Sequence, residues 1–139
     1  MNNEELINLA IEARKYAKSP TNYYVGVALV TKSGRIYTGC NLGSDNALFN
    51  ICAERVAIAK MLSEGEELIE KIVVVGGKKD ELIFTLPCGI CRQLIHDMGK
   101  DIEIIAAYYE NGELKQKSYK AKDLLPAGFE YDSNLLNNN

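Results

Sequence analysis

Three cysteines and one glutamate form the pattern in this chain with the clearest chemical use. Cys52 stands two residues before Glu54 in the stretch ICAER, and Cys88 and Cys91 form the CxxC of the stretch LPCGICRQ. Cysteine thiolates are typical zinc ligands, and CxxC is a common spacing for two of them. Three protein ligands leave the fourth tetrahedral position of zinc open, so the pattern predicts a catalytic rather than a structural Zn²⁺ site.

The two residues after Ala53 fit a catalytic metal. A carboxylate beside such a site can take a proton from water and pass it to a substrate, and we predict this acid–base role for Glu54. Without the later CxxC, the same glutamate would be interpreted as a solvated helix residue. Three thiolates around a dication leave a net negative charge, which weakens the metal as a Lewis acid. We therefore predict that Arg55 draws charge from the sulfurs and restores that acidity.

Cys40 and His96 are the other candidates for a fourth ligand. Cys40 would close the site into a structural one, but it ends a strand pattern without partner spacing, so we interpret it as a small buried hydrophobic residue. His96 is the single histidine and falls five residues after Cys91 on the same helix, turned away from it. We expect it to be packed or exposed rather than bound to metal. An all-thiolate tetrahedral set favours zinc over magnesium or manganese.

Length and composition limit the classes of protein that the chain can belong to. The 139 residues, 47% of them hydrophobic, predict a single domain over 1–139, with 134–139 as a disordered tail. A net charge of -3 without a Lys/Arg cluster argues against a nucleic-acid partner. No stretch reaches the length of a membrane span, and the charged N-terminus does not fit a signal peptide. We therefore expect a cytoplasmic location, where disulfides are disfavoured.

Helices and strands alternate along the chain, and this alternation must position the cysteines. It predicts an α/β protein, a three-layer α/β/α sandwich around a mixed central sheet. The three cysteines then lie at helix N-termini, where unpaired backbone N–H groups favour thiolate over thiol. The predicted helices span 4–18, 51–65 and 86–99; the predicted strands are a hairpin within 24–42 and single strands at 69–77, 101–109 and 113–120, followed by a short segment at 121–129.

The motifs GRIYTGCN, ICAER, SEG, PCGICRQ and LLPAGF occur in the order and at the approximate spacing of the small homotetrameric cytidine deaminases. The chain resembles this family from Val25 to Phe129. The resemblance implies that the three cysteines bind one zinc ion per chain and that Glu54 carries protons to N3 and to the leaving ammonia. The implied reaction is hydrolytic deamination at C4 of a free cytosine nucleoside, within pyrimidine salvage. The implied assembly is a homotetramer with shared active sites.

The same resemblance assigns the contacts to a nucleoside substrate. Tyr23 falls where an aromatic side chain lines the base pocket, Asn41 matches the asparagine that binds the ribose 3′-hydroxyl, and Phe129 matches a phenylalanine from a neighbouring subunit. Ala53 is also placed among the substrate-binding residues. Arg55 corresponds to the arginine that contacts the ligating sulfurs in all-cysteine members.

The sugar-binding segment departs from the family pattern. Family members read roughly NxENASY, whereas this chain reads NLGSDNA, with Gly43 in place of the glutamate and Ala47 in place of the tyrosine. Losing a charge-assisted hydrogen bond to a sugar hydroxyl costs about 1.5–3 kcal/mol. Asp45 is a candidate replacement. If the lost carboxylate decides affinity, Gly43→Glu is predicted to lower the Michaelis constant for cytidine.

The departure leaves alternatives to cytidine or 2′-deoxycytidine as the substrate. A modified cytosine nucleoside is the first, because blasticidin S deaminases share the zinc centre and also lack the glutamate. A structural zinc module that binds a protein partner is the second, and it would require Cys40 as a fourth ligand. A deaminase of polynucleotides shares the signature, but the charge of the chain argues against it.

Overall fold

A computed structural model describes residues 1–130 of the chain, so the tail predicted at 134–139 lies outside the described residues. Its centre is a five-stranded sheet with the order β2-β1-β3-β4-β5. The β3 and β4 strands run parallel and the other neighbours run antiparallel, which confirms a mixed sheet. The strands are β1 (Tyr24–Thr31), β2 (Ile36–Cys40), β3 (Ile69–Gly77), β4 (Glu103–Glu110) and β5 (Glu113–Lys120).

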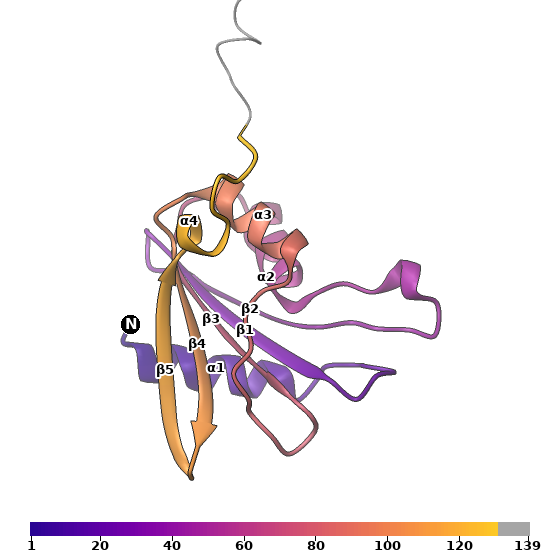
Figure 1. The fold of residues 1–139 in the computed structure, drawn as a ribbon. Helices are drawn as coiled ribbons and strands as arrows, with labels where there is room; N and C mark the ends of the chain where they lie inside the picture. The colour runs from indigo at the N-terminus through magenta and orange to yellow at the C-terminus, as the bar shows by residue number, and fades with distance from the viewer. Residues whose placement is uncertain (131–139) are drawn as a thin grey trace, which may run out of the picture.

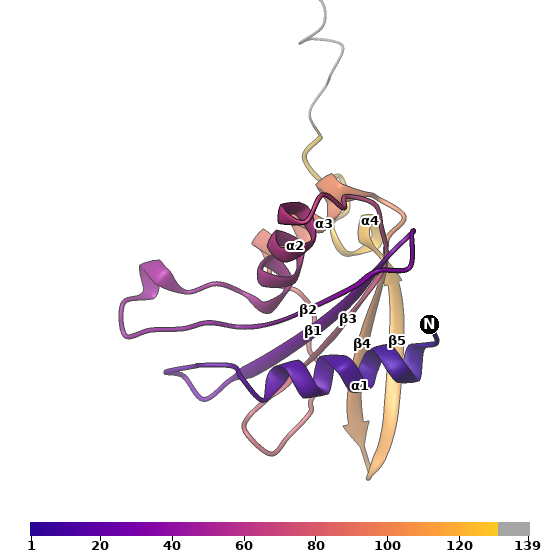
Figure 2. The ribbon, with the colours of Figure 1, turned by 180° about the vertical axis from the view of Figure 1, so that it is seen from behind.

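Helices cover both faces of this sheet and complete three layers. The long helix α1 (Asn3–Arg14) lies on one face, and α2 (Ala53–Ser63), α3 (Gly89–Met98) and the short α4 (Ala121–Leu124) gather on the other (Figures 1 and 2). The β3 strand alternates between the two cores, because Val73 and Val75 pack toward α1 while Ile72 and Val74 pack toward α2. The predicted sandwich is confirmed.

The first helix ends earlier than its apolar period predicts. A capping box between Asn2 and Glu5 begins α1, but the helix stops at Arg14 rather than at residue 18. The Arg14 guanidinium donates from Nε to the Tyr24 carbonyl (2.8 Å) and from Nη2 to the Gly77 carbonyl (3.0 Å). These bonds join the end of α1 to β1 and β3. The end of α1 is therefore fixed by contacts with distant strands, which the apolar period of the helix does not predict.

Two glycines let the helices approach the sheet closely. A Cβ at Gly26 in β1 would lie 2.0 Å from the Ala10 carbonyl oxygen of α1. A Cβ at Gly39 in β2 would lie 2.7 Å from the Ala53 carbonyl oxygen at the start of α2. Both distances are well below van der Waals contact, so any larger residue would push a helix away from the sheet. Gly39 therefore helps to set the position of Cys52, which precedes Ala53.

Two connections extend away from the layers on the same side of the molecule. One joins α1 to β1, and the other joins β2 to α2 and carries the 3₁₀ turn η1 (Ala47–Phe49) (Figures 1 and 2). A bridge between Lys18 and Leu42 holds the two connections side by side. Within residues 1–130, none of the helices combines the length and the apolar character needed to cross a membrane.

Candidate functional site

The three predicted cysteine ligands come together in space. Their Sγ atoms all lie within 4.8 Å of one another, and those of Cys52 and Cys88 are 3.6 Å apart. A tetrahedral zinc ion with Zn–S bonds of about 2.3 Å would hold its sulfurs about 3.8 Å apart. The sulfur positions therefore fit a three-thiolate zinc site with one position left for another ligand.

Two helix N-termini create this arrangement. Cys52 and Cys88 are the N-cap residues of α2 and α3, both with extended backbone, and Cys91 lies in the first turn of α3. The segment before Cys88 is held by Arg92, whose Nε donates to the Pro87 carbonyl at 2.7 Å. The zinc site thus lies between two helix ends that the sheet and Gly39 bring together.

The cysteines differ in how readily they ionise. Burial raises the pKa of the Cys91 thiol, which has no exposed surface, and burial also raises the pKa of Cys52. For Cys88, burial is opposed by the backbone N–H groups of Cys91 and Ile90, and the net effect lowers its pKa. The predicted placement of the three cysteines at helix starts is confirmed, and burial is the largest influence on the pKa of Cys52 and Cys91. A dication between the sulfurs supplies the charge that three neighbouring thiolates need.

Glu54 and Arg55 flank the sulfur cluster from the first turn of α2. Glu54 is only 3% exposed, and burial raises the pKa of its carboxyl group, while Arg55 and a hydrogen bond with the Cys91 thiol oppose this shift. Arg55 donates from Nη2 to the Cys52 sulfur at 3.8 Å, and this bond raises the pKa of the guanidinium. Its Nε is buried without a hydrogen-bond partner in the described part of the chain. The acid–base group and the cation predicted from sequence therefore both border the metal ligands.

The two rejected ligand candidates lie outside the cluster. His96 is buried in α3, so packing accounts for it as expected. Cys40 is half-buried rather than buried, and this part of the prediction is wrong. The reason is that β2 is an edge strand of the sheet, so the last residue of the strand keeps an open side. The Cys40 sulfur is absent from the group of metal-ligating atoms found in residues 1–130.

A hollow of about 210 Å³ adjoins the cluster between the two projecting connections. Cys52 and Arg55 form part of its lining, and Tyr23 and Asn41 line it as well. The Tyr23 hydroxyl is 2.6 Å from Thr85 Oγ1. Asn41 is largely engaged with the backbone: its Oδ1 accepts from the Val25 N–H (2.7 Å) and its Nδ2 donates to the Tyr23 carbonyl (2.9 Å). One Asn41 N–H therefore remains for a ligand.

The place of the family's glutamate is closed by a neighbouring segment. A Cβ at Gly43 would lie 2.7 Å from Pro20 Cδ and 3.0 Å from the Lys18 carbonyl oxygen. The expectation that Gly43→Glu improves cytidine binding is therefore revised, because the new side chain would displace this segment. Asp45 and Ala47 are both exposed, and neither lines the hollow. Asp45 is thus not placed to replace the glutamate.

The remaining two substrate contacts are not part of the hollow. Ala53 is fully buried in the core between α2 and the sheet. Phe129 is 65% exposed and lies beside α3, where its carbonyl accepts from Gln93 Nε2 at 3.1 Å. Within one chain, Phe129 lines a different hollow together with His96 and Lys100.

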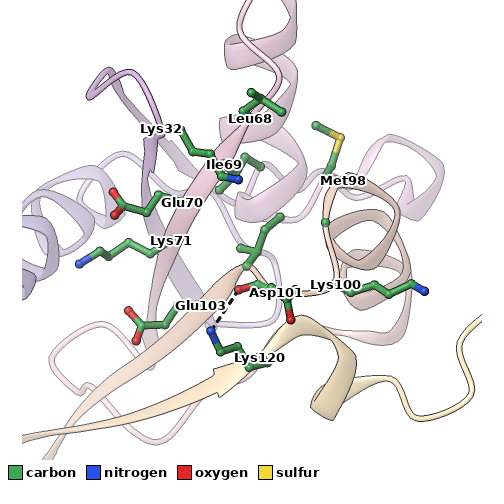
Figure 3. A pocket seen from close by; sticks show the side chains of 12 residues that line it. Lys32, Leu68, Ile69, Glu70, Lys71, Met98, Lys100, Asp101, Glu103 and Lys120 are labelled. Carbon is green, nitrogen blue, oxygen red and sulfur yellow. Dashed lines mark hydrogen bonds between the residues drawn. The ribbon is translucent and has the colours of Figure 1, made fainter.

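A further hollow of about 500 Å³ lies where β3 and β4 begin, near the end of α3 (Figure 3). Its lining mixes four lysines with three carboxylates, and Lys120 Nζ donates to the Asp101 carbonyl at 3.5 Å. None of the three clustered cysteines lines it. Charges of both signs around an open hollow are typical of a solvated rim, so this hollow carries no part of the site.

Sequence reasoning missed Pro20 and Asn50, which both line the hollow beside the cysteines. Neither residue belongs to a metal or acid–base motif. The sequence signal was indirect: Gly43 stands where the family has a glutamate, so another residue must fill the space of the missing side chain. The three-dimensional structure shows that Pro20 does so, since its Cδ lies 2.7 Å from a Cβ at Gly43.

Comparisons with known proteins agree with this geometry. Residues 1–107 match the family model for the cytidine and deoxycytidylate deaminase zinc-binding region. A probable cytidine deaminase of Dictyostelium discoideum is 38% identical, over 93% of this chain and 86% of that protein. A blasticidin-S deaminase of Bacillus cereus is 29% identical over 88% of each chain. The crystal structure of cytidine deaminase from Burkholderia pseudomallei superposes with a TM-score of 0.78 at 34% identity, covering 93% of this chain and 100% of that one.

Proposed function

Because the chain belongs to the cytidine and deoxycytidylate deaminase family, it is a zinc-dependent hydrolytic deaminase, and we propose that its substrate is free cytidine or 2′-deoxycytidine. The observation that carries the proposal is a buried carboxylate next to three clustered thiols. Glu54 hydrogen-bonds with the Cys91 thiol, and a hollow opens beside Cys52. This combination suits a hydrolysis in which protons must move without bulk water.

We assign the zinc ligands to Cys52, Cys88 and Cys91. When bound there, zinc supplies Lewis-acid activation of the attacking water. Glu54 accepts one proton from the attacking water and delivers it to N3 of the cytosine ring, and the second proton of that water goes to the departing amine. The new bond joins the water oxygen to C4, the exocyclic C4–N4 bond breaks, and ammonia leaves. Arg55 donates to the Cys52 sulfur and so reduces the negative charge at the ligands.

The hollow beside Cys52 is proposed to hold the sugar, with Tyr23 and Asn41 on its wall. Among residues 1–130, its lining contains no carboxylate. This absence supports one alternative substrate, a modified cytosine nucleoside whose substituent replaces a hydroxyl contact. The similarity to the Bacillus cereus protein named blasticidin-S deaminase points to the same alternative.

Ammonia release from cytidine by the zinc-loaded protein tests the proposal. Wild-type protein is expected to turn over cytidine, and Glu54→Gln is expected to keep one zinc ion per chain while losing at least about 100-fold in kcat. Glu12→Gln is the matched control, because Glu12 is an exposed residue of α1 and forms only an ion pair with Lys15. Turnover retained in Glu54→Gln would refute the proton-transfer role. A zinc-loaded wild-type protein inactive on both cytidine and 2′-deoxycytidine would refute the substrate.

The assembly and setting of the enzyme are also proposals. Exposed apolar side chains support a homotetramer with shared active sites: Leu48 (88% exposed) and Phe49 (68%) at η1, and Phe129 (65%) beside α3. Native mass spectrometry should give four chains and four zinc ions.

The remaining proposals concern the substrate contact and the setting of the enzyme. Ala53 is proposed to contact the substrate through its backbone only. The chain is proposed to form a single domain over 1–139 and to act on free nucleosides in cytoplasmic pyrimidine salvage. A reducing compartment such as the cytoplasm keeps thiol ligands from forming disulfides.

A further inference from the structure

Asn50 occupies the space beside Gly43 at the wall of the hollow next to the cysteines. Its Oδ1 lies 3.5 Å from the point where a side chain on Gly43 would begin, and Asn50 lines the same hollow as Tyr23, Asn41 and Cys52. A polar carboxamide is therefore present on the wall where Gly43 contributes no side chain.

The orientation of the Asn50 carboxamide is fixed by its contacts. Its Oδ1 accepts the backbone N–H of Ser44 at 3.0 Å. Because that donor identifies the oxygen, the NH₂ group faces away from Ser44. Within residues 1–130, this NH₂ group donates to no protein acceptor. Two N–H donors thus remain available to a bound molecule.

The loop that carries Asn50 is held in place before any substrate binds. Leu42 and Ile51 exchange two backbone hydrogen bonds, of 3.0 and 2.9 Å, which close the loop at its base. Further along, Ser44 Oγ donates to the Asn46 carbonyl and Asn46 Oδ1 accepts from the Leu48 N–H. A donor on such a loop loses little freedom when it binds a ligand.

We propose that Asn50 is a substrate-contacting residue that donates a hydrogen bond to a hydroxyl group of the nucleoside sugar. The inference rests on the proposed function, since a cytosine ring at the cysteines directs its sugar into the adjoining hollow. Lys18 and Pro20 close the wall beside Gly43, and Asn50 adds a carboxamide to the lining of the hollow. The enzyme then recognises the sugar with a neutral amide donor rather than with a carboxylate.

Binding of the product nucleoside tests this contact separately from turnover. Isothermal titration of the zinc-loaded protein with uridine and with 2′,3′-dideoxyuridine compares two ligands that differ only in their sugar hydroxyls. Asn50→Ala should weaken uridine binding about 3- to 10-fold and change dideoxyuridine binding less than about 2-fold. Asn8→Ala is the control: it removes an exposed asparagine of α1 that does not line the hollow, and it should leave uridine binding unchanged.

The outcomes distinguish this contact from the function on which it rests. If Asn50→Ala weakens the binding of both ligands equally, Asn50 only supports the loop through its bond to Ser44, and this would overturn the proposal. Unchanged uridine binding in that variant would overturn it as well. If wild-type protein binds neither uridine nor dideoxyuridine, the nucleoside function itself fails together with the contact. Selective loss of uridine affinity, with zinc content and Tm preserved, would establish the contact.

Discussion

Adding one methyl group at Gly43 directly tests the shape of the hollow beside Cys52 that is proposed to hold the sugar. In Gly43→Ala the new Cβ would lie 2.7 Å from Pro20 Cδ and 3.0 Å from the Lys18 carbonyl oxygen. Carbon atoms normally stay about 3.5–4.0 Å apart, so the proline ring must move by about 1 Å. The Lys18 oxygen cannot move freely, because it accepts the Gly43 N–H at 2.8 Å.

The expected cost follows from this crowding. Overpacking costs about 1–3 kcal/mol, and the lower part of that range applies here because Pro20 is exposed and part of the strain can relax. We therefore expect a loss of about 1–2 kcal/mol. For a chain of 139 residues, this corresponds to a decrease in Tm of about 3–7 °C.

Thermal unfolding of zinc-loaded Gly43→Ala, followed by near-UV circular dichroism, measures this decrease. Gly89→Ala is the matched control, since a Cβ at Gly89 meets no atom within 4 Å and should not lower Tm. Adding Pro20→Ala to Gly43→Ala removes the nearer clash and should recover part of the loss. Gly43→Glu should raise the Michaelis constant for cytidine rather than lower it. A wild-type Tm for Gly43→Ala, together with a lower Michaelis constant for Gly43→Glu, would refute the steric argument.

Four further substitutions address the metal site and the fold. Cys88→Ala should lose zinc and lower Tm, because ligand bonds join α2 to α3; one zinc ion per chain in this variant would contradict the ligand assignment. Arg55→Gln should reduce kcat/KM about 10- to 100-fold at unchanged zinc content, and unchanged kinetics would exclude charge compensation at Cys52. Cys40→Ser should keep both zinc and turnover, whereas loss of metal would indicate a closed four-cysteine site. Arg14→Lys should lower Tm by about 5–10 °C, since the single lysine nitrogen does not reproduce the planar fork that bonds β1 through Nε and β3 through Nη2, and an unchanged Tm would show that these bonds add no stability.

The sequence predicts the elements best where the local pattern and the tertiary structure agree. The β3 strand lies at 69–77 as expected, because a nearly all-apolar run ending in glycine suits a strand covered on both faces. The helix α1 ends at Arg14 instead of residue 18, since its guanidinium bonds to β1 and β3 and the following residues turn toward Leu42. Such contacts join residues far apart in the chain, and a helical period carries no information about them.

The difference between local pattern and long-range contact also separates the sulfur cluster from the hollow beside it. The sulfur cluster could be predicted, because Cys52, Cys88 and Cys91 lie at helix starts that the local sequence marks clearly. The wall of the hollow beside Gly43 could not be predicted, because it depends on a contact between Gly43 and Pro20, which lie on different connections. A missing side chain in a motif shows that something must differ, and only the three-dimensional structure shows which residue takes its place.

The metal site also explains why α2 and α3 begin without a conventional cap. Asn2 caps α1 with its side chain, whereas Cys52 and Cys88 begin α2 and α3 with no side-chain cap hydrogen bond. Each missing cap costs about 1 kcal/mol. Cys52 and Cys88 therefore lack the stabilisation of an N-cap hydrogen bond at the two positions where a thiolate must face the other helix. Local preference and function therefore conflict at Cys52 and Cys88, and zinc coordination is the interaction that offsets the cost.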